Sequence, residues 1–179
     1  MNLPVLSESR VEGVIHAPIK LIDLADWVFT LSDKEYQECS KDHIAAGTSY
    51  LADGRRMSIH VERLDKLIVQ HFVEEVSGRR QCRLVSISDT FNATGQGRGQ
   101  VRVMWEFFVE AIDEGCVKFS NHVEVQFMPG YEDVLHRHGV TLEQAQSDAL
   151  KHLKAHNVEE TVLFAKDIER KALAGRWRK

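Results

Sequence analysis

The strongest constraint on this chain is a stretch in which apolar side chains recur at every second residue between short groups of turn residues. The alternation predicts strands near residues 56–64, 67–76, 81–91, 100–112 and 116–128. The groups between them are rich in Gly, Asp and Ser: Asp65-Lys66, Ser77-Gly78, Gly95-Gln96-Gly97-Arg98-Gly99 and Asp113-Glu114-Gly115. Because such residues at this spacing form hairpin turns, the stretch predicts an antiparallel meander. A further strand fits residues 43–51, where the alternation is less regular.

After residue 130 the spacing of apolar residues changes to that of a helix. A short helical piece fits Tyr131–His138, and Thr141 with Gln144 forms the capping-box pattern that begins a long amphipathic helix. A second such pattern, Asn157 with Glu160, lies inside that helix. The sequence therefore predicts either a helix that kinks at Asn157 or two helices that abut there.

The first fifty-five residues combine one strand with short helical pieces. Residues 10–16 alternate as a strand does, and Ala17-Pro18 ends it, because proline cannot donate a hydrogen bond to a sheet ladder. Helical pieces fit residues 21–29 and 33–39, and the second begins with a capping box. This segment therefore supplies one strand and some helical cover.

This order of one strand, short helices, an antiparallel meander and a long C-terminal helix resembles the helix-grip fold of the START-like (SRPBCC) superfamily. The motif Val14-Ile15-His16-Ala17-Pro18 is similar to the end of the first strand in that superfamily. The resemblance covers most of the chain and rests on architecture and this short motif. It implies an α+β fold in which a curved antiparallel sheet wraps around the C-terminal helix. The additional helical material leaves the length of that helix open.

Members of the superfamily mostly bind lipids, polyketides, sterols or other apolar molecules, and some are cyclases, aromatases or hydrolases. The resemblance therefore implies a small hydrophobic molecule as the partner of this chain, held in a cavity between sheet and helix. The other fold that the pattern allows is the hotdog thioesterase type, in which the sheet wraps an early helix. That fold usually finishes on a strand, whereas this chain finishes with a long stretch of helical spacing.

Length and composition fit a single globular domain over residues 1–179. Hydrophobic residues make up 43% and charged residues 28% of the chain, which is typical of globular proteins. No stretch approaches the roughly 18 uncharged apolar residues of a membrane span. The N-terminus also lacks the basic and apolar segments of a signal peptide. We therefore expect a cytoplasmic protein with no membrane span.

The net charge, the cysteine spacing and the glycine-rich loop indicate which partners, compartment and cofactors to expect. The net charge is −4 and the basic residues are scattered, so we expect no nucleic-acid partner. Cys39, Cys82 and Cys116 form no CxxC pair, which indicates free thiols in a reducing compartment. The glycine-rich loop at 95–99 precedes a strand rather than a helix, unlike a dinucleotide-binding loop, and we expect no cofactor. The sequence leaves the oligomeric state open, and a homodimer is compatible with it.

Strand alternation separates an inner, apolar face of the sheet from an outer face. The predicted ligand-binding residues on the inner face are Met57, His71, Trp105, Phe107, Phe119 and Asn121. Small-molecule pockets are built in this way, from apolar walls with a few polar groups. The polar members, His71 and Asn121, have an alternative role, since they could satisfy each other, a helix backbone or a buried water. Trp105 could likewise be a core residue.

The same residues allow an acid–base enzyme of the cyclase/aromatase or hydrolase kind as the alternative function. His71 would transfer the proton, with Asp89 orienting it or Asn121 holding an oxyanion. No spacing in the sequence demands this chemistry. Ligand binding without catalysis explains the same residues with fewer assumptions.

Nine histidines raise a third hypothesis, a metal-binding or interaction protein. His152 and His156 are four residues apart on the predicted helix, so they share a face and could chelate an ion. His136 and His138 lie upstream, but on a helix they would diverge by about 200°. Solvated or core histidines explain the same pattern, and on balance the sequence predicts no metal site.

Overall fold

The computed structural model describes residues 3–64, 66–91 and 98–178. The strands in these residues are β1 (Val5–Ile15), β2 (His43–Tyr50), β3 (Arg56–Arg63), β4 (Leu67–Ser77), β5 (Gln81–Phe91), β6 (Arg98–Ala111) and β7 (Val117–Phe127). The helices are the short 3-10 turn η1 (Ile19–Leu21), α1 (Leu24–Thr30), α2 (Asp33–Gln37), α3 (Tyr131–Arg137) and α4 (Leu142–Leu173). Parts of two predicted turns, residue 65 and residues 92–97, lie outside the described residues.

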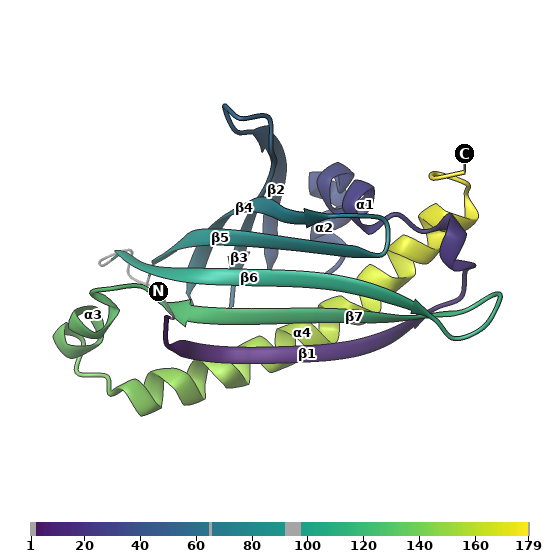
Figure 1. Cartoon of the computed structure of the whole chain (residues 1–179). Coiled ribbons are helices and arrows are strands. Elements are labelled where there is room, and N and C mark those ends of the chain that lie inside the picture. The colour runs from purple at the N-terminus through teal and green to yellow at the C-terminus, as the bar shows by residue number, and fades with distance from the viewer. Residues whose placement is uncertain (1–2, 65, 92–97, 179) are drawn as a thin grey trace.

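All seven strands belong to one antiparallel sheet with the order β1-β7-β6-β5-β4-β3-β2. From β2 to β7, strands that follow one another in the chain are neighbours in the sheet, as in the predicted meander, and β1 pairs with β7 at the far edge. The sheet bends around α4, and α1 and α2 lie beside that helix (Figure 1). The predicted α+β helix-grip architecture is confirmed.

A single helix, α4, spans 32 residues and passes through Asn157 without a break. Its first turn carries the predicted capping box of Thr141 and Gln144. The fully buried side chain of Asn157 donates to the carbonyl oxygen and the hydroxyl of Ser9 on β1, at 3.3 and 3.0 Å. The second polar pattern in the helix therefore marks a contact with the sheet, and the prediction of a kink or a helix start there was wrong.

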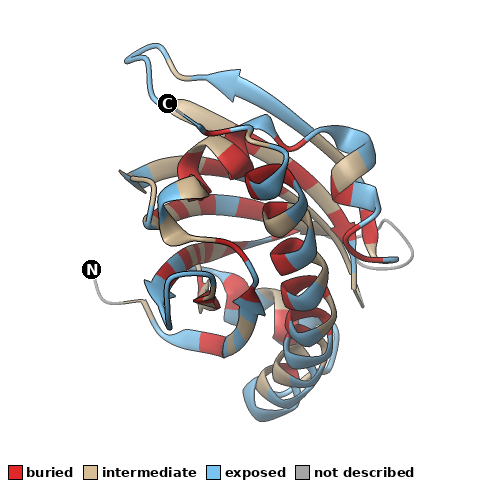
Figure 2. Cartoon of the chain, turned by 90° about the vertical axis from the view of Figure 1, so that its right-hand side faces the viewer, coloured by how far each residue is buried: buried red, intermediate tan, exposed pale blue. Residues whose placement is uncertain are grey.

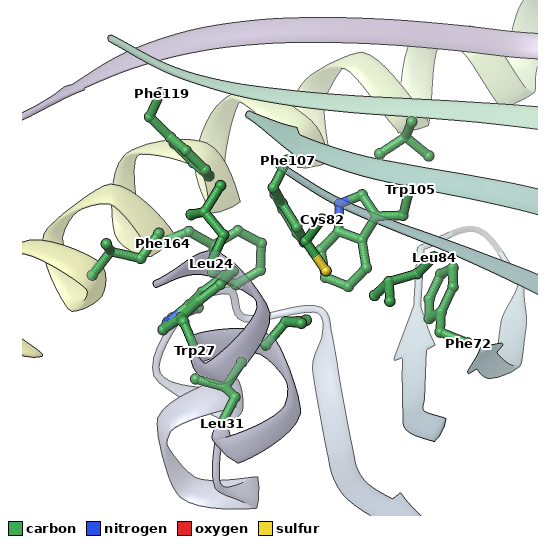
Figure 3. Packing of buried hydrophobic residues seen from close by; sticks show 14 of the residues in the cluster. Leu24, Trp27, Leu31, Phe72, Cys82, Leu84, Trp105, Phe107, Phe119 and Phe164 are labelled. Carbon is green, nitrogen blue, oxygen red and sulfur yellow. The ribbon is translucent and has the colours of Figure 1, made fainter. Parts of the chain in front are cut away.

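Aromatic packing around α1 fills one end of the space beneath the sheet. Trp27 of α1 lies against Phe107 of β6 and Phe164 of α4, in edge-to-face arrangements with ring centroids 5.3 and 5.0 Å apart. Phe119 of β7 stacks on Phe107 in the same group (Figure 3). The Trp27 indole N–H donates to Asp167 at 2.9 Å. Because none of the four rings is exposed to solvent, this end of the fold is packed core. We call these four rings the aromatic cluster.

The inner faces of β6 and β7 are those that strand alternation predicted. Trp105 and Phe107 on β6, and Phe119 and Asn121 on β7, are all buried. Buried residues concentrate where α4 meets the sheet, while the opposite side of α4 is exposed (Figure 2). Among the described residues, no helix is both long and apolar enough to cross a membrane.

Strand alternation gave the wrong inner face for β3, β4 and β5. Met57 and His71 were expected inside, and Asp89 was considered for the inside on a strand whose faces were ambiguous, but all three lie on the outer face, where His71 is exposed. The buried residues of these strands are their neighbours in sequence: Ser58, His60, Glu62, Gln70, Phe72, Cys82, Leu84, Ser86 and Ser88. The reason is that these strands carry apolar side chains on both faces, so hydrophobicity does not distinguish the faces. The inner face accepts polar residues because α2, β2 and α4 supply partners for several of them.

The three cysteines are free thiols, as predicted. Cys39 and Cys82 are buried, and burial raises the pKa of each thiol to about 12. Cys116 is partly exposed, and its sulfur lies 3.3 Å from Nδ1 of His16. The two buried thiols are therefore core residues rather than nucleophiles.

Phe164→Ala should lower the free energy of unfolding by about 3–5 kcal/mol, because it removes a fully buried ring from the aromatic cluster. Val162→Ala, on the exposed side of the same helix, should change it by less than about 0.5 kcal/mol. Urea denaturation followed by circular dichroism measures both values. Similar losses in the two variants would contradict this placement of the inner side of α4.

Candidate functional site

A cavity of about 60 Å³ lies between the sheet and α4, next to Trp105, and none of its described lining residues belongs to α1. Its walls are mainly apolar and are formed by Leu64, Ile68, Phe72, Val103, Trp105, Val123, Val125 and Leu153. The polar residues of its lining are Glu62, Gln70, His156 and Glu160. All four polar residues are buried, so the polar groups are concentrated in an otherwise apolar interior.

Two further cavities continue from this inner cavity toward α3. A middle cavity of about 90 Å³ shares Ile68 and Leu153 with the inner one. An outer cavity of about 320 Å³ shares Tyr131 with the middle one and is lined by the exposed residues His138 and Asp148. The three adjoining cavities trace a path from the surface near α3 to the interior. Of the three, only the outer cavity reaches the volume of roughly 300 Å³ at which ligand pockets begin.

The inner cavity ends at a group that we call the His–Glu cluster: His43 on β2, Glu62 on β3, and His156 and Glu160 on α4. Oε2 of Glu160 lies 3.3 Å from Nε2 of His156 and 3.5 Å from Nε2 of His43. Nε2 of His156 is also 3.8 Å from Oε2 of Glu62. Elements that are distant in the sequence thus bring two imidazoles and two carboxylates together.

Residues of α2 and the loop after it hold this cluster from behind. Tyr36 stacks on His43 with ring centroids 3.8 Å apart, and its carbonyl oxygen accepts a hydrogen bond from Nδ1 of His43 at 2.7 Å. The Tyr36 hydroxyl donates to Oε1 of Glu62. On the other side, the hydroxyl of Ser40 lies 3.4 Å from Nδ1 of His156. The capping box that begins α2 therefore positions a helix on which the site depends.

Asn121 ties the cluster to the sheet. Its Oδ1 accepts from the Trp105 indole N–H at 2.8 Å, and its Nδ2 donates to Oε1 of Glu160 at 2.9 Å and to the Thr161 hydroxyl at 3.1 Å. Asn121 is fully buried, so these bonds use its polar atoms within the protein. Its partners are a tryptophan and α4, whereas His71, the partner considered from the sequence, lies on the other face of the sheet.

Charges in the cluster shift the pKa values of its members. Burial lowers the pKa of His156, but the neighbouring carboxylates, Glu160 first, outweigh burial and raise it to about 9. Burial raises the pKa of Glu160, but His156 and then His43 lower it to about 2. Burial, and next His43, lowers the pKa of His60 to about 3. At neutral pH the cavity therefore ends at an imidazolium–carboxylate pair, while His60 is neutral.

The structure separates the predicted ligand-binding residues into three groups. Trp105 lines the inner cavity. Phe107 and Phe119 belong to the aromatic cluster, and Asn121 positions Glu160. Met57 and His71 lie on the outer face of the sheet, away from the cavity, because the faces of β3 and β4 are reversed.

The predicted acid–base pair is also on the outer face. His71 is exposed, and its backbone N–H donates to the Ser86 hydroxyl at 2.7 Å. The Asp89 carboxylate accepts from Arg98 at 2.8 and 3.0 Å and from Gln100 at 3.0 Å. These contacts stabilise the outside of the sheet, so the hypothesis that His71 and Asp89 act in the cavity was wrong.

The four histidines considered for metal binding lie in different places. His136 and His138 are exposed at the end of α3, and His152 lines the middle cavity. His156 is in the His–Glu cluster, where its imidazole neighbour is His43 rather than His152. The structure therefore does not assemble the set that the sequence suggested.

Sequence reasoning missed His43, Glu62 and Glu160. A signal for Glu160 was present, because Leu153, His156, Glu160 and Phe164 recur at steps of three and four on one side of α4. The more apolar positions Val158 and Val162 on the same helix are exposed, so hydrophobicity alone does not identify its inner side. Nothing in the spacing links His43 to these residues, since their contact depends on the way β2 and α4 pack.

No known protein-family model matches the sequence, and no curated protein matches it. Solved structures do match. The Zhui aromatase/cyclase from Streptomyces sp. R1128 has a TM-score of 0.59 at 10% identity, over 92% of this chain and 94% of that one. A START superfamily protein from Mycobacterium smegmatis has a TM-score of 0.54 at 11% identity, over 91% and 97% of the two chains. The di-domain ARO/CYC StfQ from the steffimycin biosynthetic pathway has a TM-score of 0.59 at 9% identity, over 93% of this chain and 52% of StfQ.

These matches cover more than nine-tenths of this chain at TM-scores of 0.54 to 0.59. The chain has the START-like helix-grip fold. Because only about one residue in ten is identical, the likeness shows the fold alone. The function has to be argued from the site itself.

Asn121→Leu should lower the free energy of unfolding by about 2–5 kcal/mol, because it leaves the buried Trp105 N–H and Glu160 Oε1 without their partner. Lys118→Leu, on the outer face of the same strand, removes surface ion pairs and should cost less than about 1 kcal/mol. Chemical denaturation of both variants measures the difference. A neutral Asn121→Leu change would show that this network does not hold Glu160.

Proposed function

We propose that this protein binds a small, mostly apolar molecule in the cavity between the sheet and α4, with a polar group of that molecule directed at the His–Glu cluster. The observation that supports this most is the combination of an apolar wall with a buried polar end. Burying charged groups is costly, so a protein interior rarely gathers such groups beside a cavity unless they have a use. Ligand sites commonly have this construction.

The lining indicates what kind of molecule fits. Phe72 and Trp105, with ring centroids 5.2 Å apart, offer aromatic surface on one wall. Gln70 lines the same cavity, and its Oε1 is buried without a hydrogen-bond partner among the described residues, so it can accept a hydrogen bond from a ligand. His156 and Glu160 supply a donor and an acceptor at the inner end. A ring system that carries hydroxyl groups and reaches inward from the outer cavity would offer partners to these groups.

The structural comparisons support the same class of ligand. Two of the proteins that share the fold are named as aromatase/cyclases, and a third as a START superfamily protein. An aromatic or polyketide-like molecule is therefore the ligand that we propose for this chain.

An acid–base enzyme on the same cavity is the second candidate, and the pairing of His156 with Glu62 favours it. Nε2 of His156 lies 3.8 Å from Oε2 of Glu62, and both residues line the cavity. An imidazolium can give a proton to a bound molecule while a carboxylate takes one from it. The proton-transfer role that the sequence assigned to His71 would then belong to His156 together with Glu62.

Leu153→Trp should weaken binding of 2-naphthol, a flat phenol used as the probe, by at least about tenfold, which corresponds to about 1.4 kcal/mol. The larger side chain would fill the point where the inner and middle cavities meet. Lys154→Trp adds the same ring at the exposed neighbouring position and should leave the dissociation constant unchanged. Isothermal titration calorimetry compares the two variants with the original protein. Equal affinities in all three would place binding outside the cavity and contradict the proposal.

A further inference from the structure

We propose that the His–Glu cluster is a binding site for one divalent transition-metal ion, held by His43, His156 and Glu62, with Glu160 as a fourth ligand. The ligand atoms of the first three residues all lie within 4.8 Å of one another, and the three residues are buried. Imidazole and carboxylate together are the ligand set of zinc and of several other first-row metals. This proposal stands on the cluster itself and does not depend on the apolar ligand.

The facing atoms are spaced much as they would be around a tetrahedral ion. Ligand atoms about 2.0–2.1 Å from zinc, at tetrahedral angles, are about 3.3–3.4 Å from one another. In the cluster, Oε2 of Glu160 is 3.3 Å from Nε2 of His156 and 3.5 Å from Nε2 of His43. The distance from Nε2 of His156 to Oε2 of Glu62 is 3.8 Å. Small side-chain movements would bring these four atoms to one ion.

The histidine nitrogens that face the centre lack ordinary partners. Nε2 of His43 and Nε2 of His156 are buried, and neither has a hydrogen bond of acceptable geometry among the described residues. Nδ1 of His43 faces the carbonyl oxygen of Tyr36, which can only accept, so Nδ1 carries a hydrogen. Nε2 is therefore the ring nitrogen that faces the centre, 3.5 Å from Oε2 of Glu160. A metal ion between the two groups would be bound by both of them.

The other polar atom of each proposed ligand is held by a second residue. The Tyr36 carbonyl holds Nδ1 of His43, and Asp42 and Ser40 face Nδ1 of His156 at 3.7 and 3.4 Å. A hydrogen bond from Tyr36 occupies Oε1 of Glu62, and one from Asn121 occupies Oε1 of Glu160. Metal sites use such outer contacts, above all a carboxylate or carbonyl behind each histidine, to fix the ring and its tautomer. Each ligand thus presents one atom to the centre.

The charge of the cluster also suits a divalent cation. It holds two carboxylates, and in the described part of the chain their ion-pair partners are His43 and His156. A divalent ion would balance the charge of both carboxylates. Because Glu62, His156 and Glu160 line the inner cavity, an ion held there would face that cavity.

Titration of the metal-free protein with Zn²⁺, in competition with a chromophoric chelator, tests the proposal. We expect one ion per chain with a Kd of about 1 μM or tighter. His43→Gln and His156→Gln should each weaken binding by at least about 100-fold, since each removes a ligand. His71→Gln is the matched control, because it removes an exposed histidine on the outer face of the sheet and should leave the Kd unchanged. A stoichiometry or affinity that none of these changes alters would overturn the proposal.

The original protein loaded with Co²⁺ provides a second readout if a histidine variant does not fold. Four-coordinate Co²⁺ with nitrogen and oxygen ligands should give intense visible absorption, because tetrahedral geometry strengthens these bands. Stoichiometric Zn²⁺ should remove the absorption by displacement. A weak spectrum typical of six-coordinate Co²⁺, or no binding at all, would show that the cluster is an ion pair and not a metal site.

Discussion

Asn121 and Glu160 connect the sheet to α4, and the position of the whole site depends on this connection. The amide of Asn121 joins the Trp105 indole on one side to the Glu160 carboxylate on the other. One turn earlier on the same helix, Asn157 donates to Ser9 on β1. A helix that only packed apolar side chains could slide or rotate against the sheet. These buried hydrogen bonds fix one register, since leaving any of them unmade is costly.

The same connection divides the space beneath the sheet into two parts. On one side, Trp27 of α1 and the aromatic rings around it form packed core (Figure 3). On the other side, the cavity extends toward α3 and is closed at its inner end by the His–Glu cluster. Trp105 touches both parts, because its ring packs on Phe107 and also lines the cavity. The short helices that the sequence placed before the meander therefore fill one end of the space beneath the sheet, and the cavity lies at the other.

Much of the fold could be predicted from the sequence, but of the site only Trp105 and Asn121 were among the predicted ligand-binding residues. The order of elements, the long C-terminal helix and the faces of β6 and β7 follow from periodicity, because there one face is consistently apolar. β3 offered no such contrast, since Met57 and Ile59 are as apolar as any inner residue while the inner positions hold Ser58 and His60. Those polar residues lie inside because of partners elsewhere in the fold. Such partners are invisible to local patterns, and His43 is the clearest example.

Methyl-group NMR spectra recorded during addition of 2-naphthol test the central claim most directly. If an apolar molecule enters between the sheet and α4, the methyl resonances of Val103, Val123 and Leu153 should shift together, because all three line the inner cavity. The exposed methyl groups of Val162 and Ile112 should not move. Shifts confined to exposed methyl groups, or none at saturating concentration of the probe, would contradict binding in this cavity.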